Sequence, residues 1–126
     1  MKKNIVVLPG DGVGPEVTNE AVKVIKKIAE KFHHQFIFKE GLIGAIAIDK
    51  TGNSYPEETH QLCLNSDAIL FGAIGDLKYD NNPKAKIRPE QGLLKMRKSL
   101  GLFANLRPIN VFPSLINKSP LKKEII

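Results

Sequence analysis

The chain has 126 residues, of which 42% are hydrophobic, so it can bury the core of one globular domain and is not a disordered segment. Its formal net charge of +6 comes from basic residues dispersed along the sequence, and no DNA- or RNA-binding module is legible, which argues against a nucleic-acid binder. No apolar run reaches the roughly 18–20 residues that span a bilayer, and the single cysteine, Cys63, fits a cytoplasmic protein that keeps this residue in its core.

Strand and helix patterns alternate through the first half of the chain. Residues 4–8 form a continuous apolar run, which predicts a strand buried on both faces. A glycine-rich turn follows, and Pro15 opens a predicted helix that continues to about Phe32. Apolar residues at helical spacing predict that this helix faces the core with Val17, Ala21, Val24, Ile28 and Phe32. A second strand is predicted at residues 35–38, and residues 45–49 form a short helix or an extended piece.

The second half continues the alternation. We expect a helix at residues 56–65, a third buried strand at 67–71 and a long loop at 72–87. Pro89 and Glu90 suit the first turn of a helix that Gly101 ends, and residues 102–107 read as a strand closed by Pro108. Another helix is expected to begin at residues 120–122. Alternating strands and helices predict an α/β fold, with a sheet covered by helices on both faces.

The predicted helix after Pro89 carries groups that could bind a ligand. Four residues fall at positions i, i+3, i+4 and i+7 and therefore share one helical face: Glu90, Leu93, Leu94 and Arg97. The next strand would deliver Arg107, and two arginines in one cleft suit a small dianion, because each guanidinium can hold a carboxylate through two parallel hydrogen bonds. The two leucines would hold an apolar branch of the same molecule. The alternative is an ordinary amphipathic helix with its charges in water and a core side of Leu93, Met96 and Leu100.

Two loops follow strands at their carboxyl ends, where ligands bind in open α/β sheets. The spacing of Gly10, Gly12 and Gly14 differs from the GxGxxG dinucleotide fingerprint, although the helix that follows can attract negative groups at its N-terminus. The alternative is that these glycines only permit a tight turn. The loop after the third strand is either a ligand site or a mobile surface loop. No metal-site spacing is visible, so we expect solvated or capping roles for the three histidines, His33, His34 and His60.

The segment at residues 88–108 resembles the substrate-binding segment of the isocitrate/isopropylmalate family of β-decarboxylating dehydrogenases. That family's run, RPE-x-GLL-x-x-RK followed by LFANLRP, is present here in full. The string LPGDGVGPEV resembles the family's N-terminal signature. The loop after the third strand resembles G-x-x-G-G-P-K-W-D, keeping Gly75, Lys78 and Asp80 and departing at Asp76, Leu77 and Tyr79. The resemblance covers essentially the whole chain, but only roughly the N-terminal third of a family member.

The resemblance implies an oxidoreductase that oxidises 3-isopropylmalate with NAD and releases carbon dioxide, giving 4-methyl-2-oxopentanoate in leucine biosynthesis, with Mg²⁺ or Mn²⁺ polarising the reacting oxygens. Arg97 and Arg107 would hold substrate carboxylates, Leu93 and Leu94 would contact the isopropyl branch, and Glu90 would lie near branch and nicotinamide. The implied cofactor-binding residues are Val13, Gly75, Asp76, Leu77, Lys78, Tyr79, Asp80, Arg88, Pro89 and Glu90.

The leucine pair favours an isopropylmalate-type member over an isocitrate type. Isocitrate carries a third carboxylate where isopropylmalate has an apolar branch, and leucines beside Glu90 would leave that carboxylate desolvated and unpaired. Two alternatives stay open. One is a sister enzyme acting on another 3-substituted malate, such as tartrate or homoisocitrate, and the other is a non-catalytic product of a truncated gene.

The resemblance also implies what these residues lack. In the family, the acid–base tyrosine and lysine, a third arginine and the metal-binding aspartates lie beyond the matched region. We therefore expect residues 1–100 to be the N-terminal part of a discontinuous cofactor-binding domain, and residues 101–126 to begin a second, truncated substrate and dimer domain. A homodimer is expected of the full-length protein. The chain alone is expected to be inactive and poorly folded, because it would leave open sheet edges and apolar faces.

Overall fold

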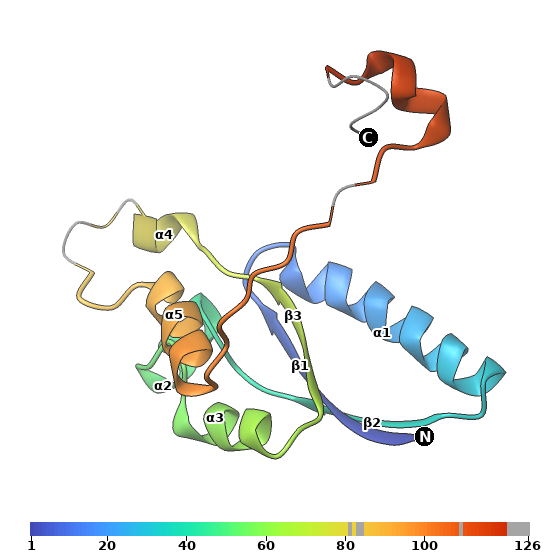
Figure 1. The fold of residues 1–126 in the computed structure, drawn as a ribbon. Helices are drawn as coiled ribbons and strands as arrows, with labels where there is room; N and C mark the ends of the chain where they lie inside the picture. Colours follow the sequence, from blue (N-terminus) through green and yellow to red (C-terminus); the bar gives the residue numbers. More distant parts are fainter. Residues whose placement is uncertain (81, 83–84, 109, 121–126) are drawn as a thin grey trace.

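The computed structural model describes residues 1–80, 82, 85–108 and 110–120. Strands β1 (Lys2–Gly10), β2 (Gln35–Glu40) and β3 (Ala68–Ala73) form a parallel sheet in the order β2-β1-β3, as Figure 1 shows. In the register of the sheet, Ile5 of β1 lies between Phe38 of β2 and Ala68 of β3. The strands predicted at 4–8, 35–38 and 67–71 are thus confirmed with longer or slightly shifted bounds.

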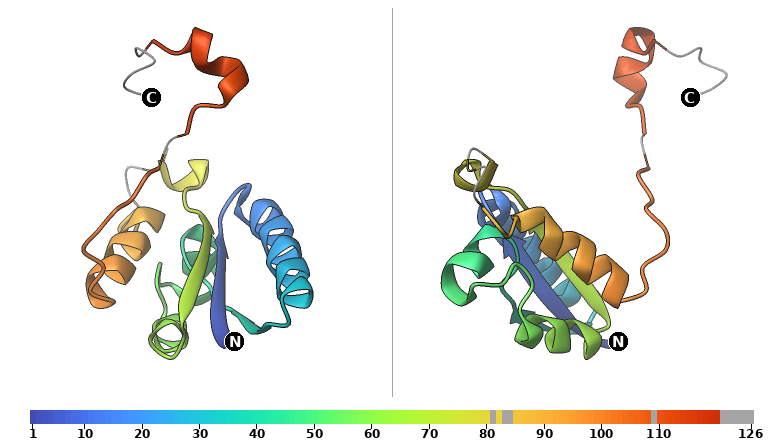
Figure 2. Two further views of the ribbon diagram at one scale, coloured as in Figure 1. Left: turned by 45° about the vertical axis from the view of Figure 1, so that its right-hand side comes forward. Right: turned by 90° about the vertical axis from the view of Figure 1, so that its left-hand side faces the viewer.

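Helices lie against both faces of this sheet. Helix α1 (Gly14–Lys31) covers one face, and α3 (Glu57–Leu64) and α5 (Pro89–Ser99) lie on the opposite side, as the left view of Figure 2 shows. Helix α2 (Ala45–Thr51) lies at the carboxyl end of β1. Of the two conformations expected for residues 45–49, a short helix or an extended piece, the structure has the helix. The predicted α/β architecture with helices on both faces is confirmed.

The core lies between the sheet and helices α3 and α5. Residues that alternate along β1 point to this side, and Cys63 of α3 and Met96 of α5 meet them, in a buried cluster of Val6, Leu8, Ile43, Tyr55, Cys63 and Met96. Val7, between the two cluster residues of β1, is also buried. The prediction of a strand buried on both faces therefore holds for the middle of β1, whereas β2 and β3 are only half-buried. Cys63 is a core residue, as predicted.

The predicted core stripe of α1 is wrong. Val17, Val24, Ile28 and Phe32 are 45–59% exposed, and only Ala21 of that stripe is half-buried. The helix faces the sheet instead with Gly14, Thr18 and Ala29, which are buried, and with Val22 and Ile25, which are half-buried. Close approach explains the choice, because a Cβ atom on Gly72 of β3 would lie 3.0 Å from Cγ2 of Thr18. Both the exposed stripe and the buried stripe of this helix have helical spacing. The small side chains at the fully buried positions let the helix lie closer to the strands.

The structure also corrects the predictions after residue 72. The expected loop contains a short helix, α4 (Leu77–Asp80), because Oδ1 of Asp76 accepts the N–H of Lys78 at 2.9 Å and caps the turn. Helix α5 forms where predicted, and Gly101 follows it with φ of +67°. The strand predicted at 102–107 is wrong: this stretch is extended, but no described strand pairs with it, and Phe103 is fully exposed.

A 3₁₀ helix, η1 (Pro113–Lys118), follows the extended stretch and was not predicted. These residues project away from the sheet in Figure 1. The helix expected to begin at residues 120–122 falls mostly outside the described residues. Within the described ranges, no helix is both long and apolar enough to cross a membrane.

Candidate ligand site at the carboxyl ends of the strands

Three segments approach one another at the carboxyl end of the sheet. The turn after β1 is held against the end of β3, because the N–H of Asp11 donates to the carbonyl of Ala73 at 2.8 Å. The loop that follows β3 in turn meets α5, since a Cβ atom on Gly75 would lie 3.6 Å from Oε1 of Glu90. In parallel sheets this edge is where ligands bind, so the structure gathers two predicted site residues, Gly75 and Glu90, at the expected place.

The glycines of the first turn permit close packing. Gly10 has φ of +72°, and a Cβ atom there would lie 2.0 Å from the carbonyl oxygen of Ala73. Gly14 is equally confined by the carbonyl oxygen of Pro9, whereas Gly12 has open space around it. Gly10 and Gly14 therefore permit a tight turn, and whether this turn also binds a ligand stays a prediction. Val13 lies just before α1 and is 57% exposed, so its side chain is free to contact a ligand.

Asp11 is the residue of this turn that the sequence analysis missed. Its side chain is buried, and its carboxylate accepts the backbone N–H groups of Ala45 at 2.8 Å, Ile46 at 2.9 Å and Gly75 at 3.1 Å. The first two donors belong to the first turn of α2, so Asp11 caps that helix from a distance. The partners of Asp11 lie far away in the sequence, so they leave no pattern around this residue. No signal in the local sequence would have revealed this role.

The loop after β3 is tied to α2 at a second point. Asp49 of α2 forms an ion pair with Lys78 of α4 and accepts a hydrogen bond from the Tyr79 hydroxyl at 2.8 Å. The hydrogen bond from Lys78, followed by that from Tyr79, lowers the pKa of the Asp49 carboxyl, and the same contacts raise the pKa values of Lys78 and Tyr79. Tyr79, a departure from the family pattern, thus has a structural use for its hydroxyl.

The other residues predicted in this loop differ in exposure. Leu77 is 74% exposed and Asp80 is exposed, whereas Asp76 is partly buried. Arg88 precedes α5 and donates through its guanidinium to the carbonyl of Tyr79 at 3.2 Å. Its backbone N–H donates to Oε1 of Gln91 at 3.0 Å, which caps the start of α5. Arg88 therefore joins the loop after β3 to helix α5.

Helix α5 has a core side and a solvent-exposed side. Its inner side is the predicted core side, with Met96 buried and Leu93 and Leu100 packed against the core cluster. Pro89 is also buried. Its outer side presents the remaining predicted residues to solvent: Glu90, Leu94 and Arg97. Leu94 is 63% exposed, so of the two leucines it is the one available to a ligand.

The predicted pairing of two arginines stays a prediction. Arg107 lies exposed in the extended stretch after α5, which leads away from that helix in Figure 1. Arg97 is also exposed, in the last turn of α5.

Within the described ranges, no group of three or more His, Cys, Asp or Glu side chains gathers to hold a metal ion. The solvated or capping role predicted for His60 is wrong, because its ring is half-buried against Tyr55, with the Tyr55 hydroxyl 3.2 Å from Nδ1. The tyrosine is fully packed in the core, so it needs a polar partner for its hydroxyl.

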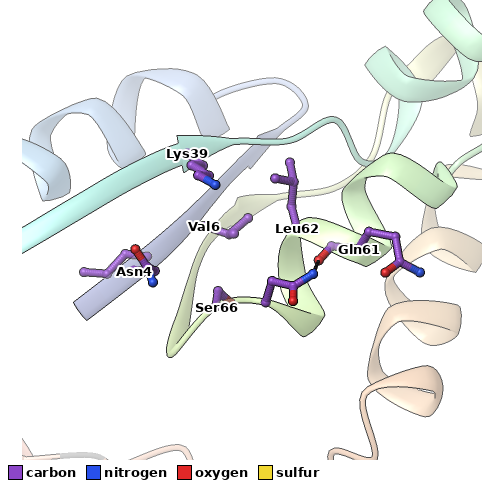
Figure 3. Close-up of a pocket in the computed structure, with 8 residues that line it drawn as sticks. Asn4, Val6, Lys39, Gln61, Leu62 and Ser66 are labelled. Carbon is purple, nitrogen blue, oxygen red and sulfur yellow. Dashed lines mark hydrogen bonds between the residues drawn. The ribbon is translucent and has the colours of Figure 1, made fainter. Parts of the chain in front are cut away.

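A separate pocket of about 220 Å³ lies towards the amino end of the sheet, between α3 and strands β1 and β2. Figure 3 shows Asn4 and Lys39 on the strands facing Leu62 and Ser66 at α3 and the turn that follows it. None of the predicted site residues lines this pocket.

The fold and the sequence together define the class of protein. The family model described as isocitrate/isopropylmalate dehydrogenase matches residues 4–126, and the chain belongs to this family. Among curated proteins, the chain is 59% identical over 126 residues to the 3-isopropylmalate dehydrogenase of Bacillus subtilis and 53% identical to that of Bacteroides fragilis, strain YCH46. Each match covers all of this chain but only 34% and 36% of those proteins, so the chain spans about a third of their length.

A solved structure agrees with the family assignment. The β-decarboxylating dehydrogenase of Thermococcus kodakarensis, in its apo form, superposes with a TM-score of 0.61 and 31% sequence identity. The match covers 79% of this chain and 27% of that protein. The predicted family and fold class are confirmed by these comparisons.

Proposed function

We propose that this chain forms the N-terminal part of an NAD-dependent 3-isopropylmalate dehydrogenase, an oxidoreductase of leucine biosynthesis. The observation that carries the proposal is identity of 53–59% over the whole chain to proteins of that name from Bacteroides fragilis and Bacillus subtilis. The reaction oxidises the substrate hydroxyl, loses the 3-carboxylate as carbon dioxide and yields 4-methyl-2-oxopentanoate.

The outer side of α5 is the proposed substrate surface. Arg97 would hold a substrate carboxylate through paired hydrogen bonds, with Arg107 holding a second one. The exposed Leu94 would contact the isopropyl branch, and the half-buried Leu93 would support it from the core side. Glu90 would lie between branch and nicotinamide, a position that its proximity to Gly75 favours. A carboxylate in place of the isopropyl branch would meet Leu94 and Glu90 and find no partner.

NAD suits the loops at the carboxyl ends of β1 and β3. Val13 is exposed beside open space at Gly12, and Gly75 has φ of +134°, a conformation that a residue without a side chain adopts freely. When bound, NAD supplies the hydride acceptor. The chain's own part would be to orient it: Val13 against adenine, and the stretch from Gly75 to Asp80 with Arg88, Pro89 and Glu90 along the nicotinamide half. Lys78 and Tyr79 would lie along the cofactor with their side chains held by Asp49.

The described residues do not fit a divalent metal, because none of their His, Cys, Asp or Glu side chains gathers into a ligand set. Mg²⁺ or Mn²⁺ would be held by residues outside this chain, and nothing in the roles above depends on it. We further propose a domain boundary near Gly101, since packing against the core ends at Leu100 and the residues that follow are exposed. The full-length protein would be a cytoplasmic homodimer.

A chimera tests the substrate assignment. This chain replaces the matching segment of the Bacillus subtilis relative, which is 59% identical over 126 residues. We expect the chimera to reduce NAD with 3-isopropylmalate, and Leu94→Ser to raise the KM for that substrate about tenfold, because one apolar contact contributes roughly 1–3 kcal/mol to discrimination. The KM for NAD should stay unchanged. Lys95→Ser, an exposed neighbour on α5, is the matched control and should change neither constant.

Other outcomes identify the alternatives. A chimera that prefers tartrate or homoisocitrate would make the chain part of a sister enzyme. A folded chimera without activity on any of these substrates would make it a non-catalytic product. Reading the coding DNA past codon 126 and weighing the intact protein from its source would establish whether the missing chemistry is encoded with it.

A further inference from the structure

A single buried carboxylate connects three segments of the candidate site. Asp11 lies at the end of β1, and its two carboxylate oxygens accept N–H groups from the start of α2 and from Gly75 in the loop after β3. Its own backbone N–H donates to Ala73, the last residue of β3. One residue therefore fixes where the loop after β3 leaves the sheet.

The environment of Asp11 leaves its side chain one position. The residue is 5% exposed, and a buried carboxylate is tolerated where hydrogen bonds replace its hydration. Oδ2 accepts from both Ala45 and Gly75, while Oδ1 accepts from Ile46. Gly44 closes the space from the other side, since a Cβ atom there would lie 2.3 Å from Oδ2. Asp11 cannot turn without breaking contacts to two segments at once.

A second contact strengthens the connection between α2 and the same loop. Asp49 lies in α2 and holds Lys78 and Tyr79 through its two oxygens. The loop is thus attached at Gly75 through Asp11 and at α4 through Asp49. Helix α2, which contributes no predicted site residue, contacts the loop through Asp49 and shares the Asp11 carboxylate with Gly75.

We propose that Asp11 is a positioning residue for cofactor binding, which sets the Gly75 end of the loop against the turn after β1. The inference rests on the proposed function for its ligand, NAD, and extends it to a residue that does not touch the cofactor. Asp49 contributes in the same direction from α2, more weakly because its ion pair with Lys78 is exposed.

The test is Asp11→Asn in the chimera described above. An amide of the same shape offers one oxygen and one NH₂ group, so at least one of the three backbone donors then faces another donor. We expect the KM for NAD to rise about tenfold, the scale on which loss of a charge-assisted hydrogen bond acts. The KM for 3-isopropylmalate should change less than twofold. Hydrogen exchange should accelerate in the peptide that covers residues 72–80.

Thr59→Val is the matched control. Thr59 is 2% exposed, and its hydroxyl donates to the carbonyl of Leu42 at 2.8 Å and accepts the N–H of that residue at 3.2 Å. Valine keeps the shape and removes both bonds, neither of which is made to the loop after β3. We expect lower stability with an unchanged KM for NAD and unchanged exchange at residues 72–80.

The outcomes separate this inference from the proposed function. An inactive parent chimera refutes the proposed function. An active chimera in which Asp11→Asn lowers stability but leaves the KM for NAD unchanged overturns the inference alone. Should Asp11→Asn fail to fold, Asp49→Asn decides, because that side chain is half-exposed and holds the same loop. A raised KM for NAD with faster exchange at residues 72–80 supports the positioning of the loop from outside the cofactor site, and unchanged values of both overturn it.

Discussion

The two faces of the sheet bury apolar residues in different ways. On the side of α3 and α5, large side chains interlock, and Leu8, Ile43 and Tyr55 are at most 1% exposed. On the other side, the residues that α1 buries fully are the small Gly14, Thr18 and Ala29, whereas Val17, Val24 and Ile28 lie largely in water. The difference teaches that helical spacing identifies a stripe, whereas the distance between helix and strand decides which stripe is buried.

The largest effect on stability should come from the side of the sheet that α3 and α5 cover. Leu8→Ala removes a fully buried side chain from the core cluster and should lower the free energy of unfolding by about 3 kcal/mol, because the packed sheet and helices can close the cavity only in part. Val24→Ala on the outer stripe of α1 is the counterpart and should cost under about 0.5 kcal/mol. Denaturant unfolding of the chimera measures both. A cost at Val24 comparable to that at Leu8 would break the comparison and show that the stripe is covered in the longer protein.

A smaller effect on stability is expected from the contact between Tyr55 and His60 on the same side of the sheet. Burial raises the pKa of Tyr55, so its hydroxyl stays neutral and serves only as a hydrogen-bonding group towards His60. Tyr55→Phe should cost about 1 kcal/mol, the net contribution of one buried hydrogen bond. The same denaturant titration measures it, with Thr59→Val as a second buried hydroxyl. A neutral or stabilising result would mean that packing alone holds Tyr55 against α3.

The smallest effect on stability should come from the exposed ion pair between Asp49 and Lys78, and it should depend on pH. The pKa of Asp49 is lowered by the hydrogen bond from Lys78, so the pair stabilises the fold above the ordinary carboxyl pKa of 3.8 and is lost as the pH falls through the lowered value. Because the Lys78 pKa is raised, that contribution is fully present below the ordinary value of 10.5 and lost only above it. Asp49→Asn should therefore lower the melting temperature slightly near neutral pH and not at all in strong acid. An equal shift at both pH values would contradict the ion pair.

The sequence alone determined the fold class, the three strands within a few residues, the buried cysteine and the start of α5 at Pro89. These follow from local chemistry: continuous apolar runs, proline at a helix start and glycine after its end. Of the face predicted for α5, Glu90, Leu94 and Arg97 are exposed, whereas Leu93 packs against the core, because helical spacing does not say where a face ends.

Only the tertiary structure decided which stripe of α1 is buried, whether residues 102–107 pair as a strand, and what Asp11 does. Each of these depends on partners far away in the chain. A helix with two apolar stripes buries the one that fits the strands beneath it, and an extended run becomes a strand only beside another strand. Asp11 meets Gly75 across 64 positions of sequence, a contact that exists only once β1, α2 and β3 have come together.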